Sequence, residues 1–162
     1  MKSGRKKDAV VTQLLALLRG GQAHASFKQA VAGFPARHRG VVPDGLPYSA
    51  WQLVEHIRIA QRDILDFSNN HDGTYKPLKW PKDYWPKAAA PATGAWDKSL
   101  RAIRADRAAF ERLLNAKGAD LNAAFPWGDG QTLMREAFLL ADHDAYHVGE
   151  IVMLRRLLGC WK

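Results

Sequence analysis

Residues 131–158 read QTLMREAFLLADHDAYHVGEIVMLRRLL and predict the longest helix of the chain. Apolar side chains return there at the three- and four-residue spacing that gathers them on one side of an α-helix. They are Leu133, Ala137, Leu140, Ile151, Leu154 and Leu158. Gln131 or Thr132 is expected to begin this helix, and Gly159 to end it.

Two histidines lie on the same apolar side. His147 is seven residues from both Leu140 and Leu154, and His143 lies one turn before it. Successive helix residues turn by about 100°, so the two imidazoles are offset by only about 40°. Because a buried polar group costs stability unless it has a partner, a shared metal ion is one explanation for the pair. Taken alone, an H-x-x-x-H pair is also common in ordinary helices.

The rest of the chain predicts further helices and no alternating strand pattern. Gly20, Pro35 and the stretch FPWGDGQT are among the features that break it into segments. The expected helices are a first helix over about 7–19, a short one over about 23–33, a second main helix from the cap Ser49 to about Asn69, and a third over about 95–116.

Apolar positions within these segments predict which sides are buried. In the first two segments they are Val10, Leu14, Leu17 and Leu18, then His24, Phe27, Val31 and Phe34; in the second main helix they are Leu53, Ile57, Ala60, Ile64 and Phe67. Residues 71–94 have no helical period. We therefore predict one domain, residues 1–162, that is an all-α four-helix bundle with a long crossover between the second and third main helices.

His56 lies at the border of the buried stripe of the second main helix. Three imidazoles from two helices would leave a fourth position open on a metal, as in catalytic zinc sites. The alternative for His56 is a half-exposed side chain bonded to a nearby carboxylate, Glu55 or Asp63. Of the other histidines, His24 is expected at the edge of the core, and the second possibility for it is that it lines a pocket. His38 and His71 are expected on the surface.

Two stretches together resemble the DinB/YfiT-like superfamily. They are YSAWQLVEHIRIAQRDIL, which begins at Tyr48, and DHDAYHVGEIVMLRRLLG, which begins at Asp142. The resemblance implies a four-helix bundle in which His56, His143 and His147 converge on a divalent metal. It also extends over His147, Gly149 and Glu150. Members include transferases and isomerases that use low-molecular-weight thiols, so the resemblance implies a metalloenzyme without naming its reaction.

Acidic residues near the histidine pair suggest supporting roles. Glu150 lies within about 20° of His143 on the helix and could order a metal-bound water or act as general base; it could equally bond Arg58 or the backbone. Asp142 or Asp144 could accept the spare N–H of a ligand imidazole, or both could face solvent. A ferritin-like di-iron site is rejected, because its pairs of glutamate and Glu-x-x-His ligands are missing.

The composition narrows the classes of partner. The net charge is +8, but Arg101, Arg104 and Arg107 are expected to form a solvated helix face, and no nucleic-acid-reading motif accompanies them. No stretch is long and apolar enough for a membrane span. Cys160 is the single cysteine, which fits a reducing compartment. We expect a cytoplasmic protein that binds neither membranes nor nucleic acid.

The leading hypothesis is a mononuclear metal-dependent enzyme, a transferase or hydrolase, acting on a small molecule such as a low-molecular-weight thiol. Imidazole ligands suit several metals, with zinc the first expectation and nickel, iron or manganese as alternatives. Aromatic side chains are expected to line the pocket, or merely to cap the bundle: Tyr75, Trp80, Tyr84, Trp85 and Trp51. The alternative is a non-catalytic, metal-stabilised module of a stress response that dimerises or binds a partner. A homodimer is one possible assembly, and the sequence leaves the oligomeric state open.

Overall fold

A computed structural model shows that the described part of the chain, residues 9–161, is helical. It contains no strand, only an isolated bridge between Ala124 and Thr132. The elements are α1 (Ala9–Arg19), α2 (Phe27–Val31), a 3₁₀ turn (Ala36–His38), α3 (Ala50–Ser68), α4 (Ala95–Leu114) and α5 (Leu133–Leu157). None of these helices combines the length and apolar character needed to cross a membrane.

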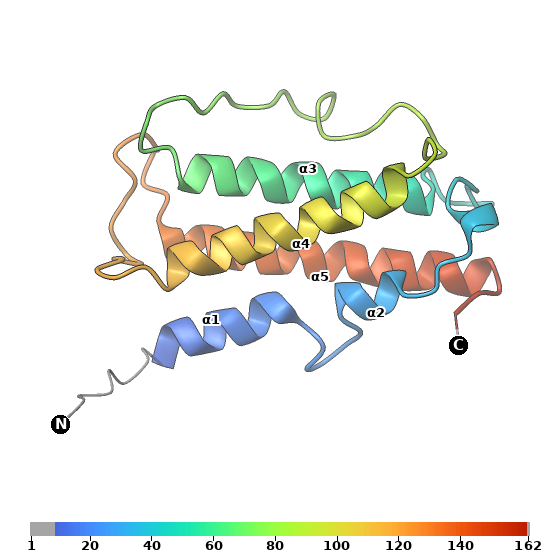
Figure 1. Cartoon of the computed structure of the whole chain (residues 1–162), viewed down its shortest axis with the longest axis horizontal. Helices are drawn as coiled ribbons and strands as arrows, with labels where there is room; N and C mark the ends of the chain where they lie inside the picture. Colours follow the sequence, from blue (N-terminus) through green and yellow to red (C-terminus); the bar gives the residue numbers. More distant parts are fainter. Residues whose placement is uncertain (1–8, 162) are drawn as a thin grey trace.

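Three long helices form the body of the molecule (Figure 1). α3 and α4 run in the same direction, and α5 runs back against both of them. The short helices α1 and α2 follow one another along α5, on the side away from α3. The segment 69–94 returns along the outside of α3 to the start of α4, which allows those two helices to be parallel.

Side-chain caps fix where the helices begin. Ser49 accepts a hydrogen bond from the backbone N–H of Gln52, whose side chain accepts one from the backbone N–H of Ser49. This reciprocal pair is a capping box, which satisfies N–H groups that lack a partner at a helix start. Ser26 and Gln29 form the same box for α2, and Thr132 caps α5. The expected starts at Ser49 and Thr132 are therefore confirmed.

Some details of the expected helices are wrong. α2 spans five residues rather than 23–33, because its capping box begins it only after Ser26. α1 buries Val11, Leu14, Leu15 and Leu18, whereas Val10 and Leu17 are about half exposed. Lys7 and Asp8, which were included in the expected first helix, lie outside the described residues. In α3 the expected stripe is buried except for Phe67, which is only half-buried.

The apolar core is divided into two clusters along the bundle axis. One cluster contains Ile57, Ile103 and Val148, and the other contains Ile64, Phe110 and Ala141. On α3, α4 and α5 alike, about two helical turns separate the clusters. Polar residues fill this gap, including Gln61, Asp106, Asp144 and His147, all of them buried. The sequence thus places a polar layer across the middle of the fold, and His143 and His147 belong to it.

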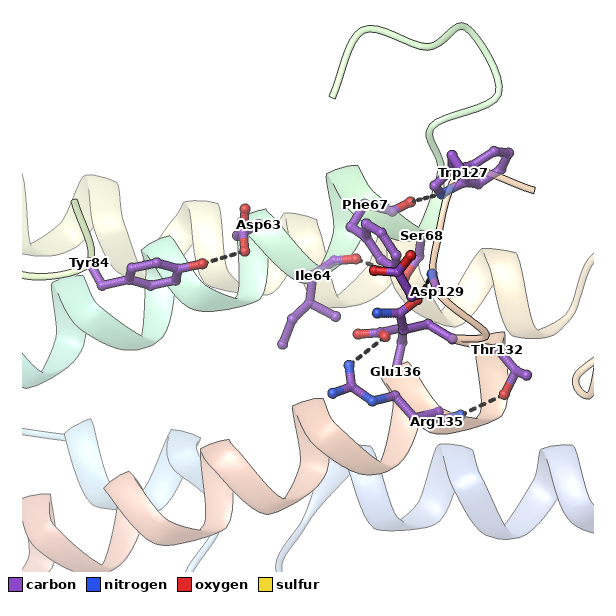
Figure 2. Close-up of polar contacts among 11 residues, drawn as sticks. Asp63, Ile64, Phe67, Ser68, Tyr84, Trp127, Asp129, Thr132, Arg135 and Glu136 are labelled. Atoms are coloured by element: carbon purple, nitrogen blue, oxygen red, sulfur yellow. Dashed lines mark hydrogen bonds and ion pairs between the residues drawn. The ribbon is translucent and has the colours of Figure 1, made fainter. Parts of the chain in front are cut away.

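The segment 69–94 is fastened to the outer side of α3 by two tyrosines. The hydroxyl groups of Tyr75 and Tyr84 donate to the two carboxylate oxygens of Asp63, at 3.0 and 2.6 Å. Figure 2 shows the second of these bonds. Ser49 adds a third link, because its hydroxyl donates to the backbone carbonyl of Ala89. The segment 69–94 is therefore held against α3 at Asp63 and at the N-terminal cap of the helix.

Glu136, in the first turn of α5, is a buried carboxylate at the opposite end of the fold from Ser49. It is 2% exposed and pairs with Arg135, whose side chain is 55% exposed (Figure 2). Burial raises the pKa of Glu136, and Arg135 opposes that rise only in part. The ionised form of this side chain is thus disfavoured by folding.

We predict that Glu136→Gln stabilises the protein at pH 7 by on the order of 1 kcal/mol. Because the folded pKa is raised, the folded wild type binds a proton more readily than the unfolded chain. The wild type therefore gains stability as the pH falls and loses it as the pH rises through the raised pKa. Denaturant unfolding should show the gap between variant and wild type closing near pH 4. Glu111→Gln, which breaks an exposed pair with Arg19, is the control; a gap that widens in acid would contradict the prediction.

Candidate metal centre

Three histidines meet where α3, α5 and the crossover come together. His56 of α3 and His143 of α5 bring their Nε2 atoms to 3.1 Å from one another. The ring centroid of His147 lies 4.6 Å from that of His56 and 4.4 Å from that of His143. One nitrogen of each imidazole lies within 4.8 Å of the others. The three side chains expected to converge do converge.

The outer nitrogens show which atoms face inward. His56 Nδ1 lies 3.0 Å from the backbone carbonyl of Tyr84, and His147 Nδ1 lies 2.6 Å from a carboxylate oxygen of Glu150. A carbonyl can only accept, so His56 Nδ1 carries the hydrogen and its Nε2 presents a lone pair. The carboxylate assigns the same tautomer to His147. Both imidazoles thus offer unprotonated Nε2 atoms to one point.

This geometry fits a bound cation. Two nitrogens each about 2.05 Å from a tetrahedral zinc ion would be separated by about 3.3 Å, close to the 3.1 Å between His56 and His143. His143 Nδ1 is buried without a hydrogen-bond partner. Three clustered imidazoles, one of them incompletely bonded, are costly to bury, and a cation between them would offset that cost. Among the described residues, no carboxylate belongs to this group of ligand atoms.

His56 and His143 are neutral at neutral pH. Burial, together with the nearby His147 and His56, lowers the pKa of His143 to about 3. Burial also lowers the pKa of His56, although the Tyr84 carbonyl opposes that effect. Metals bind the unprotonated imidazole. The site is therefore ready for a metal without first releasing protons from these two side chains.

Aromatic side chains cover the histidines from the crossover. The Trp85 ring stacks on His56, with centroids 4.0 Å apart and planes within 4°, and Tyr48 stacks on Trp85 at 5.4 Å. Trp80 lies 6.3 Å from His56 and remains 70% exposed. Trp51 was expected here but is buried in the core. The rings of Trp80, Tyr84 and Trp85 thus adjoin the site as expected.

Glu150 holds His147 in place rather than pointing away from it. One of its carboxylate oxygens accepts from His147 Nδ1 and the other from the hydroxyl of Tyr48. Burial and this carboxylate raise the pKa of Tyr48, which keeps its hydroxyl protonated as a donor. Arg58, the alternative partner, pairs with Glu55 instead. These contacts favour a positioning role for Glu150; its roles as a base or in ordering water stay predictions.

The two aspartates beside His143 do not contact the histidines. Asp142 is exposed, whereas Asp144 is buried and forms an ion pair with Arg107 of α4. Burial raises the pKa of Asp144 to about 6, although Arg107 opposes the rise. Neither aspartate therefore bonds a ligand imidazole, and the solvent-facing alternative is confirmed for Asp142 but wrong for Asp144. The solvated position expected for Arg107 is also wrong, although Arg101 and Arg104 are exposed.

The Arg107 contacts explain its inward position. Its guanidinium also donates to the backbone carbonyl of Leu18 at 2.8 Å and to the side chain of Gln61 at 3.4 Å. Arg107 thereby joins α1, α3, α4 and α5. Its spacing from Ile103 and Phe110, both fully buried, also predicts from the sequence that Arg107 lies on the mixed face of this helix, and that prediction is confirmed.

The other expectations for histidines have mixed outcomes. His24 is exposed rather than at the edge of the core, and its Nδ1 lies against the Ala25 carbonyl. His71 is exposed, as expected, and His38 is half-buried. His56 is buried and is not bonded to Glu55 or Asp63, because those carboxylates bind other groups. The carboxylate-bonded alternative for His56 is therefore wrong.

We predict that Glu150→Gln weakens metal binding by about 10-fold or more, because the groups that orient a ligand imidazole are typically worth 10–100-fold in affinity. The amide offers one carbonyl oxygen where the carboxylate serves both His147 and Tyr48. Competition with a chromophoric chelator measures the affinity. Tyr48→Phe, which leaves the bond to His147 in place, should have the smaller effect; equal affinities in wild type and Glu150→Gln would contradict the positioning role.

Comparison with known proteins agrees with this geometry. The family comparison matches residues 9–151 to the DinB superfamily. That range contains α1 to α4 and all three histidines of the site. No curated protein and no solved structure matches the chain, so the family assignment stands on this match, which spans most of the sequence. The chain belongs to the DinB superfamily.

Proposed function

We propose that this protein is a mononuclear metal-dependent enzyme whose ion is bound by His56, His143 and His147. The observation that carries the proposal is the pairing of the outer nitrogens. Tyr84 and Glu150 turn two imidazoles so that their Nε2 atoms face the third. Zinc is the first candidate, and nickel, iron and manganese are alternatives. The scaffold is a four-helix bundle in which α1 and α2 together take the place of one helix.

A divalent ion in such a site lowers the pKa of a bound thiol or water and so supplies a nucleophile at neutral pH. The chain's own residues supply orientation. Glu150 and the Tyr84 carbonyl fix two imidazoles, and Trp85 shields one face of His56 from water. His143 is the least buried of the three. Substrate would therefore approach from its side, where the fourth ligand position is expected.

The substrate class that we propose is a small molecule activated through a thiol or by water, in a transferase or hydrolase reaction. An exposed aromatic ring near the histidines supports a small organic substrate. Trp80 is 70% exposed and lies 6.3 Å from His56. Such a ring can pack against an apolar or planar group.

The alternative function is a metal-stabilised module without catalysis. It is favoured by the burial of His56 and His147, which are 2% and 6% exposed, since structural metal sites are closed. The two functions differ in whether an exogenous ligand can reach the ion. That difference gives the test.

The test uses protein loaded with Co²⁺ in place of the native ion, titrated with a small thiol such as 2-mercaptoethanol. An open position predicts a thiolate-to-cobalt absorption band in the wild type, and none in cobalt-free protein. Loaded protein whose visible spectrum is unchanged by the thiol, and also by azide, would contradict the catalytic proposal and favour the structural one. His71→Ala, at an exposed histidine, is the control for adventitious cobalt.

A further inference from the structure

α5 carries large apolar side chains on the side that faces away from the other helices. Each of them is more than one-third exposed: Phe138, Leu139, Tyr146, Met153 and Leu157. The opposite side of α5 contributes buried residues to both core clusters. A helix that is apolar on all sides is normally covered on all sides. We refer to this outward side of α5 as the α5 face.

The α5 face is also hollowed where α5 meets α1 and α2. A cavity of about 620 Å³ is lined by Leu17, Phe138 and Ala145. A second cavity, of about 470 Å³, is lined by Ala145, Gly149 and Met153 among others. Ala145 thus stands between two hollows. A Cβ atom added at Gly149 would meet nothing within 4 Å, so another helix could approach closely there.

The charges on the α5 face have a symmetric arrangement. Asp142, Gly149 and Arg156 follow one another at intervals of seven residues. Seven residues of an α-helix rise by about 10.5 Å and turn by about 20° less than two full turns. All three are exposed. An acidic residue therefore lies two turns before Gly149 and a basic residue two turns after it, on nearly the same side of the helix.

This arrangement of charges is complementary to the same face of a second copy whose α5 runs in the opposite direction. A two-fold axis at Gly149 places Asp142 level with Arg156 of the second copy, and the same pair forms again on the other side of the axis. It also places Met153 of the second copy level with Ala145, between the two hollows. A two-fold interface requires such self-complementarity, because each patch meets its own copy.

We infer that the α5 face is the interface of a homodimer in which the α5 helices of two copies pack antiparallel about Gly149, with reciprocal Asp142–Arg156 pairs. The interface buries the exposed apolar side chains of α5, and a surface with such large apolar patches is typical of an interaction site. It also brings Tyr146, which contacts His147, close to the second copy. The inference does not depend on a bound metal.

Sedimentation velocity of the full chain over a wide range of concentration tests this interface. The wild type should be a dimer. Asp142→Arg and Arg156→Asp should each raise the dimer dissociation constant by at least about tenfold, because each puts two like-charge pairs in the interface. The double variant Asp142→Arg/Arg156→Asp should restore the wild-type constant, since it exchanges the charges.

Arg104→Asp, an exposed charge reversal on α4, is the matched control and should leave the dimer unchanged. Unchanged circular dichroism and melting temperature show that the variants are folded. A wild type that stays monomeric, or that is a dimer insensitive to both single reversals, would overturn the proposal. A double variant whose dimer dissociation constant is no lower than those of the single variants would also overturn it, because the two charges would then not face one another.

Discussion

His143→Ala is expected to abolish the stabilisation that the protein gains from added metal. A metal ion at a hundredfold excess over its dissociation constant stabilises a folded protein by about 2.7 kcal/mol. For a chain of this size that is a rise in melting temperature of roughly 5–11 °C. Loss of one of the three protein ligands should weaken metal affinity by more than the roughly 100-fold that loss of an orienting group can cause. At the same metal concentration the rise in melting temperature should therefore disappear.

The melting temperature of the metal-free variant separates this effect from simple damage to the fold. The Nδ1 atom of His143 is buried without a hydrogen-bond partner, so removal of the imidazole should not strongly destabilise the metal-free protein. His71→Ala should keep the full metal-induced rise, because His71 is exposed and its ring contacts Trp127 rather than the three histidines. An equal rise in wild type and His143→Ala would show that the metal binds elsewhere.

Asp144→Ala is expected to destabilise the protein by about 3–5 kcal/mol, the cost of removing one partner from a buried ion pair. Arg107 would remain between four helices with its charge uncompensated, since its other partners are a backbone carbonyl and an amide. The measurement is urea unfolding at pH 8, where Asp144 is ionised because its pKa of about 6 lies well below that pH.

Asp44→Ala is the control for Asp144→Ala. Asp44 lies in the loop before α3 and is exposed, and a surface substitution of this kind changes stability by about 0.5 kcal/mol or less. A loss of less than about 1 kcal/mol in Asp144→Ala would mean that Arg107 is solvated in the folded protein. In that case the polar layer would not hold the helices together as described.

The sequence predicts the histidine site well because helical periodicity is regular. A residue spacing of four fixes the relative direction of His143 and His147, and the buried stripe of α3 fixes that of His56. The capping roles of Ser49 and Thr132 can be predicted equally well, because a cap bonds only to the first turn of its own helix. The caps and the pairing of His143 with His147 depend on geometry within one helix, whereas the approach of His56 depends on how α3 packs against α5.

The contacts made by the crossover could not be predicted in the same way. Residues 69–94 have no period, so nothing in the sequence shows that the carbonyl of Tyr84 would bond His56 or that Trp85 would stack on it. Such contacts depend on the path of an irregular backbone. For Arg107 the sequence supports two conflicting predictions. Its charge favours a solvated stripe with Arg101 and Arg104, and its spacing from Ile103 and Phe110 favours the mixed face of the helix, where the structure places it.

Metal content is the measurement that tests the central claim most directly. Protein made without a histidine tag is incubated separately with zinc, nickel, iron and manganese, freed of unbound ions by gel filtration, and analysed for metal and protein. The three-histidine site predicts one ion of at least one of these metals per chain, retained in His71→Ala and absent from His143→Ala. A wild type that retains no stoichiometric amount of any of them would contradict the claim that His56, His143 and His147 form a metal centre.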